Sequence, residues 1–101
     1  MIGTEIAFRL GPGSLQDART IAARLAGLAP RAVEHVLFCD AGAGEYGCLA
    51  VWATASEADA YVAAPGVAAE LAALAARMGK PTRVRRYVME YQRTRQVPGG
   101  S

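Results

Sequence analysis

Cysteine and histidine are scarce in this chain of 101 residues, which contains only Cys39, Cys48 and His35 of these two types. No C-x-x-C spacing occurs, so the residues that usually bind zinc do not form a suitable pattern. Two cysteines in neighbouring predicted strands are most simply interpreted as reduced core residues, with a cross-strand disulfide as the alternative. We therefore expect no metal site and no bound cofactor.

Long apolar runs and a strong charge imbalance are also missing. No stretch approaches the roughly 20 apolar residues that span a bilayer. The N-terminal sequence MIGTEIAFRL lacks the basic start, apolar core and cleavage site of a signal peptide. The formal net charge of +2 is too small to indicate nucleic-acid binding. These features predict a cytoplasmic protein whose partners are neither membranes nor nucleic acids.

Apolar residues, by contrast, are abundant at 52% of the chain, and many of them are alanine. A chain of this length forms one domain with its own core. Alanine buries little area per residue, so a single protomer has limited stability. The apolar excess indicates a surface that needs a partner, most simply a second copy of the chain.

The stretch from Glu45 to Pro65 organises the rest of the sequence. Tyr46 to Thr54 reads as a strand, which places four residues on one face: Tyr46, Cys48, Ala50 and Trp52. Ser56 and Asp59 form an S-x-x-D helix-capping signal, and Pro65 interrupts or kinks the helix that follows. Trp52 and Tyr61 are then expected to border one cavity, beside small residues that leave room.

The remaining patterns complete an alternation of strands and helices. Strands are predicted over 4–10, 33–40, 46–54 and 82–92, with helices over 15–29 and from 56, through the break at Pro65, to 78. This order, βαββαβ, predicts an α+β ferredoxin-like domain over residues 1–92 and a disordered tail over 93–101. Two helices cover one face of an antiparallel sheet, and a second copy covers the other.

The turn Ala41-Gly42-Ala43-Gly44 predicts a hairpin between the second and third strands. His35, Leu37 and Cys39 share one face of the second strand. The long glycine turn does not determine the register, and a shift of one residue would place Glu34 instead of His35 beside Trp52.

The stretch GCLAVWATASEADAYVAAPGVAAEL resembles the antibiotic biosynthesis monooxygenase superfamily of dimeric α+β barrels. The shared features are a strand ending in V-W, a short Ser/Thr-rich link, and an acidic helix start with an aromatic residue and a proline. The resemblance implies a homodimer, a ligand cavity between sheet and helices, and cofactor-free oxidation of a phenolic or enolic aromatic molecule. It also implies that the superfamily's tryptophan corresponds to Trp52, with Tyr61 as an approximate match to its helical tyrosine.

The sequence departs from that superfamily at two points. It contains no asparagine, which the haem-degrading and polyketide-oxidising members use near their tryptophan. It also has no histidine on the second helix, where haem-degrading members hold iron. These departures argue against haem degradation.

The catalytic candidates are His35, Trp52, Tyr61 and Arg86. His35 has the only side chain with an ordinary pKa near neutrality and is the candidate base. Trp52 and Tyr61 offer stacking walls with a polar group, and Arg86 or Arg85 could stabilise an enolate or phenolate. The candidate substrate contacts are Leu37, Cys48, Ala50 and Tyr87.

These candidates, together with what the resemblance implies, lead to three possible functions. The first is a tailoring monooxygenase of aromatic polyketide or related metabolism that acts on a small aromatic or polyketide-like molecule. The second is a polyketide cyclase that uses the same base and cavity. The third is a non-catalytic dimeric module for ligand binding or stress response, which the alanine-rich helices favour.

Overall fold

The computed structural model describes residues 1–92, and the tail predicted over 93–101 lies outside the described residues. The elements in chain order are β1 (Ile2–Arg9), α1 (Leu15–Gly27), β2 (Glu34–Asp40), β3 (Glu45–Trp52), α2 (Ala55–Ala63), α3 (Pro65–Met78) and β4 (Arg83–Val88). The predicted order of strands and helices is confirmed, with the second helix divided into two.

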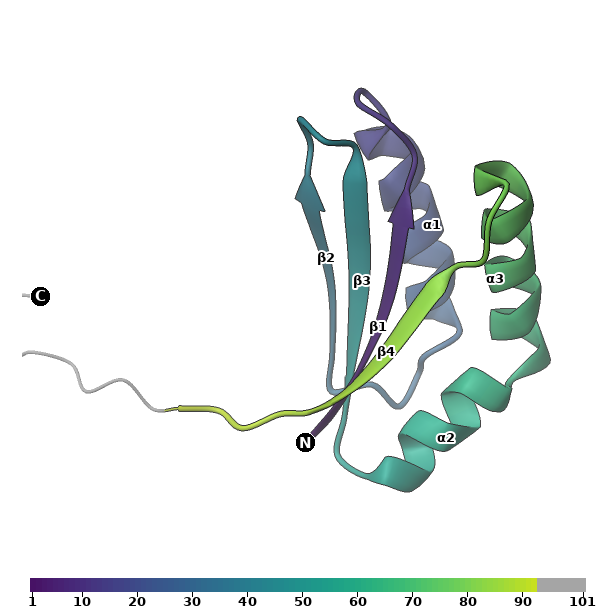
Figure 1. Ribbon diagram of the computed structural model, residues 1–101. Coiled ribbons are helices and arrows are strands. Elements are labelled where there is room, and N and C mark those ends of the chain that lie inside the picture. The colour runs from purple at the N-terminus through teal and green to yellow at the C-terminus, as the bar shows by residue number, and fades with distance from the viewer. Residues whose placement is uncertain (93–101) are drawn as a thin grey trace, which may run out of the picture.

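The four strands form one antiparallel sheet in the order β2-β3-β1-β4. This is the ferredoxin-like arrangement, in which two βαβ halves interleave. All three helices lie on one side of the sheet (Figure 1), with α1 against β2 and β3, and α2 and α3 against β1. We call this side the helix face and the other side the open face. The α+β ferredoxin-like fold is therefore confirmed.

Strand alternation accounts for the core. Ile6 and Phe8 of β1 pair with Cys48 and Tyr46 of β3, so their side chains share the helix face. The apolar stripe of α1 packs on them through its buried residues Ala18, Ile21, Ala22 and Leu25.

The break between α2 and α3 arises at Pro65. Ala64, which precedes the proline, is extended at φ −67° and ψ 132°. Pro65 then occupies the first turn of α3, where its missing N–H leaves no hydrogen bond unmade. The two helix axes differ by 60°, which confirms the predicted kink. Within residues 1–92 no single helix has the length and apolarity to cross a bilayer, and α2 and α3 reach them only as a bent pair.

The start of α2 corrects one prediction. The capping residue is Thr54, whose Oγ1 accepts a hydrogen bond from the Glu57 N–H at 3.2 Å. Ser56, the predicted cap, already lies inside the helix. The reason is that β3 ends at Trp52, so the extended backbone that a cap requires falls at Thr54.

The last strand is shorter than predicted, because β4 ends at Val88 rather than at 92. The chain beyond it crosses the open face beside the Trp52 end of β3. Met89 lies against Gly3 of β1, and the Tyr91 hydroxyl donates to Glu34 of β2 at 3.2 Å. This crossing covers one end of the open face.

Away from this crossing, the β2 edge of the open face keeps large apolar side chains in solvent, whereas β1 and β4 present Glu5, Arg83 and Arg85 on that face. Val36 and Phe38 of β2 are 40% and 44% exposed. Leu49 of β3, which pairs with Val36, is half-buried. The Phe38 ring lies over Gly47, where any larger residue would meet it.

Both cysteines are free. Cys48 is a core residue as predicted, but Cys39 is exposed, so the prediction for Cys39 was wrong. Cys39 lies near the end of β2, an edge strand with a neighbouring strand on one side only.

Candidate functional site

Trp52 and Tyr61 form the centre of the candidate site. Their ring centroids are 5.0 Å apart and the ring planes are tilted by 45°, a geometry that aromatic pairs favour. Both side chains are buried, with exposures of 2% and 4%. The structure thus brings together the two aromatic residues that the sequence singled out.

The tight link between β3 and α2 produces this pairing. Trp52 is the last residue of β3, and the Thr54 cap begins α2 two residues later. Tyr61 follows almost two helical turns on, and with Ala58 it forms the buried stripe of α2. The helix therefore returns over the strand end and lays Tyr61 against the indole.

The indole N–H of Trp52 donates to Thr4 Oγ1 at 3.1 Å. Thr4 is a buried polar residue of β1 with 3% exposure. It pairs with Ala50, which places its side chain on the helix face beside the indole. Sequence analysis did not name Thr4, although its alternation with Ile6 and Phe8 was a usable signal.

Cys48 and Ala50 lie on the same face of β3 and are 2% and 1% exposed. Burial raises the pKa of the Cys48 thiol to about 11. Burial, with a smaller effect from neighbouring Cys48, raises the pKa of Tyr61 to about 12. Both groups are therefore neutral at pH 7, and Tyr61 is a hydrogen-bond donor there.

The hairpin register determines which β2 residue faces this centre. His35 pairs with Ala50 and Leu37 pairs with Cys48, while Glu34 pairs with Val51. His35 and Leu37 consequently lie on the helix face with Trp52, and Glu34 lies on the open face. The register left open by the sequence thus favours the histidine.

His35 carries a ring nitrogen, Nε2, that is buried and has no hydrogen-bond partner within the described residues. Burial lowers the pKa of His35, so its imidazole is neutral at pH 7. A neutral imidazole with a free ring nitrogen has the chemistry of a general base.

Two more polar atoms in residues 1–92 are buried without a partner, the hydroxyls of Tyr61 and Tyr46. All three lie between the sheet and the helices. Each buried polar group without a hydrogen-bond partner lowers the stability of the fold by about 1–3 kcal/mol. Three such groups between the sheet and the helices are therefore candidates for contact with a bound molecule.

A hollow of about 380 Å³ adjoins Trp52 and Tyr61 between the end of α1 and the start of α2. We call it the indole hollow. Its lining residues are Leu28, Ala29, Pro30, Arg31, Trp52, Ser56, Glu57, Ala60, Tyr61 and Ala64. Arg31 and Glu57, which sequence analysis did not identify, place one charge of each sign on its wall.

Neither Arg86 nor Tyr87 lines the indole hollow, although Arg86 is the cross-strand neighbour of Thr4. Arg86 forms an ion pair with Asp59 at 2.7 Å and donates to the Ala55 carbonyl at 3.2 Å, so it ties β4 to α2. Tyr87 pairs with Gly3 on the open face and donates to Glu5 at 3.3 Å. Residues 86 and 87 point to opposite faces, and Tyr87 does not line the cavity beside Trp52.

Metal-ligating side chains do not gather at this site. Among residues 1–92, no group of three or more His, Cys, Asp or Glu side chains is arranged to hold a metal ion.

Comparison with known proteins supports the fold. No protein-family model matches the sequence, and no curated protein matches it. Among solved structures, SnoaB, a cofactor-independent oxygenase from Streptomyces nogalater, is 20% identical with a TM-score of 0.64, covering 92% of this chain and 93% of SnoaB. Rv0793 from Mycobacterium tuberculosis is 14% identical with a TM-score of 0.69, covering 92% of this chain and 98% of that one.

A third structure, of an antibiotic biosynthesis monooxygenase, is 14% identical with a TM-score of 0.66 and covers 90% of this chain and all of that one. The chain therefore has the α+β fold of antibiotic biosynthesis monooxygenase structures. The resemblance stated from the sequence is confirmed at the level of the fold.

Proposed function

We propose that this chain is a cofactor-independent monooxygenase that oxidises a small phenolic or enolic aromatic molecule with O₂. The observation that carries the proposal is the pair of unpartnered polar atoms on the helix face with Trp52, namely His35 Nε2 and the Tyr61 hydroxyl, although of these two residues only Tyr61 lines the indole hollow. A substrate oxygen would accept from Tyr61 and donate to His35, which satisfies both groups at once. The aromatic pair supplies the surface against which a flat substrate stacks.

The chemistry balances without a cofactor. His35 removes a proton from the substrate, and O₂ adds to the resulting carbanion carbon to form a hydroperoxide. Loss of water then leaves a carbonyl, so one oxygen atom enters the product and the other leaves as water. The substrate supplies all four electrons. Tyr61 stabilises the enolate oxygen by a hydrogen bond.

A homodimer belongs to the proposal. The open face of one protomer exposes Val36 and Phe38 beside Leu49, an apolar surface typical of an interface. A second copy laid against the first would bury this surface on both chains by the same contacts.

Oxygen uptake tests the proposal. Purified protein is incubated with a dihydroxyanthracene-type substrate while O₂ consumption and product mass are followed. We expect turnover to fall at least tenfold in His35→Gln and in Tyr61→Phe. Tyr87→Phe removes a hydroxyl on the opposite face of the sheet and serves as the matched control, with unchanged turnover. Equal rates in all four proteins would refute the proposed roles.

A non-catalytic ligand-binding module is the second candidate. It is favoured by the neutral state of Cys48 and Tyr61 at pH 7 and by the engagement of Arg86 with Asp59. In that case the same aromatic probe would quench Trp52 fluorescence with no O₂ uptake. A cyclase would release water from a poly-β-ketone, also without O₂ uptake, and the product mass separates these outcomes.

A further inference from the structure

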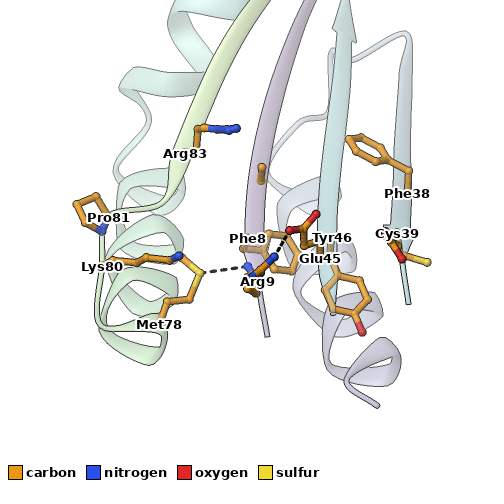
Figure 2. Close-up of a pocket in the computed structure, with 12 residues that line it drawn as sticks. Phe8, Arg9, Phe38, Cys39, Glu45, Tyr46, Met78, Lys80, Pro81 and Arg83 are labelled. Atoms are coloured by element: carbon orange, nitrogen blue, oxygen red, sulfur yellow. Dashed lines mark hydrogen bonds and ion pairs between the residues drawn. The ribbon is translucent and has the colours of Figure 1, made fainter. Parts of the chain in front are cut away.

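A second and larger hollow lies at the other end of the sheet. Its volume is about 670 Å³ and its wall includes the Glu45 end of β3 and the start of β4 (Figure 2). The seven-residue step along β3 from Glu45 to Trp52 spans about 24 Å at the usual rise per residue. None of its lining residues also lines the indole hollow. It is therefore a separate site, which we call the strand-split hollow.

The hollow exists because β1 and β4 separate. Their pairing ends at Ala7 and Arg83, although β1 continues to Arg9. Before Arg83 the chain turns away toward α3, where Thr82 Oγ1 donates to the Leu71 carbonyl at 3.1 Å. Pro81 has no N–H with which to extend the ladder. The end of β1 is consequently left without a strand partner on this side.

One backbone donor at the split has only a weak acceptor. The Arg9 N–H points to the Met78 thioether, with the nitrogen 3.3 Å from Sδ. A thioether sulfur is a poor acceptor compared with a carboxylate oxygen. A ligand oxygen entering the split would give this N–H a much better partner.

Two cations face the same gap. Figure 2 shows the side chains of Lys80 and Arg83 pointing from the β4 side toward β1. Neither forms an ion pair with any residue in 1–92. The third basic group, the Arg9 guanidinium, is already paired with Glu45. Asp40 also lines the hollow and accepts from the Ala43 N–H. The basic side chains of Arg9, Lys80 and Arg83 thus face the two acidic side chains of Asp40 and Glu45, which leaves one formal positive charge in excess next to the poorly satisfied N–H.

We propose that the strand-split hollow binds a small organic carboxylate with an apolar, aromatic-sized body. The carboxylate accepts from the Arg9 N–H and pairs with Lys80 and Arg83, because charge-assisted hydrogen bonds to a carboxylate are among the strongest available. The body of the ligand packs on Phe8, Met78 and Pro81, which belong to the apolar part of the wall and lie outside the apolar surface assigned to the dimer. This proposal does not depend on the oxygenase activity, since it uses none of the residues placed beside Trp52.

A titration of the full-length, ¹⁵N-labelled protein with 2-naphthoate tests the site. We expect the Arg9 amide resonance to shift progressively while the Trp52 indole N–H resonance stays in place. Arg83→Gln and Lys80→Gln should each weaken binding about tenfold, the loss expected for one charge-assisted contact. The matched control is Arg85→Gln, which removes the same charge from the same face of β4 outside the hollow. Its affinity should stay within twofold of the wild type.

The neutral isostere 2-naphthamide separates the carboxylate from the aromatic body. It should bind at least tenfold more weakly than 2-naphthoate. The proposal is overturned by any of three results: the Trp52 indole resonance shifts instead of the Arg9 amide, Arg85→Gln weakens binding as much as Arg83→Gln, or acid and amide bind equally. Absence of binding at millimolar 2-naphthoate also overturns it.

Discussion

A single hydrogen bond holds the indole of Trp52 to the sheet, which makes Thr4 the residue on which the orientation of that ring depends. Thr4→Val keeps the shape of the side chain but leaves the buried indole N–H without an acceptor. We expect the free energy of unfolding to fall by about 1–3 kcal/mol, the usual penalty for an orphaned buried group. Urea unfolding of the variant and the wild type measures this change in the free energy of unfolding. Thr20→Val is the control, because Thr20 is exposed and bonds only the Gln16 carbonyl of its own helix; its change should stay within about 0.5 kcal/mol.

His35 gives stability a pH dependence whose sign follows from its burial. Because the pKa of His35 is lowered in the folded state, the unfolded chain binds more protons as pH falls below its ordinary value near 6.5. The stability contributed by the neutral ring is thus present above pH 6.5 and is lost as pH falls through the lowered pKa. Chemical unfolding at pH 7.5 and 5.0 should show this loss, and His35→Gln should reduce it. A variant with the same pH slope as the wild type would contradict the assignment.

At the scale of secondary-structure elements, the start of α2 depends on Thr54. Thr54→Ala removes the side-chain acceptor of the Glu57 N–H, and loss of such a cap costs about 0.5–2 kcal/mol. Ser56→Ala, in contrast, changes a residue within the first turn and should alter the free energy of unfolding by less than about 0.5 kcal/mol. Thermal unfolding of the two variants compares the capping residue in the structure directly with the one that the sequence motif indicates. Equal losses would show that Thr54 is not the cap.

The β2–β3 hairpin joins the end of β1 through Gly44. Its carbonyl accepts from the Leu10 and Gly11 N–H groups at 3.0 and 3.3 Å, and its φ of +69° is left-handed. A methyl group there would collide with the Gly11 backbone. Gly44→Ala should therefore lose about 2 kcal/mol or more in urea unfolding. Gly42→Ala, in the same turn without a positive φ or a close neighbour, should be nearly neutral.

These elements show which parts of the fold can be predicted from the sequence. Alternation of apolar residues predicted all four strands, and Pro65 predicted the kink, because both effects are local. The capping site was placed two residues late because Thr54 and Ser56 are both suitable cap residues, and only the point where β3 leaves the sheet decides between them. The end of β4 was placed too late because Met89 and Tyr91 continue the apolar pattern while contacting other strands.

At the scale of the whole molecule, the sequence predicted only those contacts of the candidate site that join residues close to each other along the chain. Trp52 and Tyr61 are only nine positions apart in one strand–link–helix segment, and this short connection brings them together. Thr4 could not be assigned to the indole without knowing that β1 and β3 pair in register. Arg86 has a basic side chain suited to an anion, but its partner Asp59 comes from another element. Contacts between distant segments depend on register and packing, which a single sequence leaves open.

Substitution of two valines with similar exposure, one on the open face and one on the helix side, tests the association of two copies. Val36 on the open face is 40% exposed and Val62 on α2 is 44% exposed. If two open faces pack together, Val36→Glu buries an unpaired carboxylate on each side, which costs several kcal/mol, and the dimer dissociation constant should rise about 100-fold or more. Val62→Glu adds the same charge on the helix side and should leave that constant unchanged. Sedimentation equilibrium across micromolar concentrations measures both. A monomeric wild-type chain, or equal weakening by the two variants, would place the interface elsewhere.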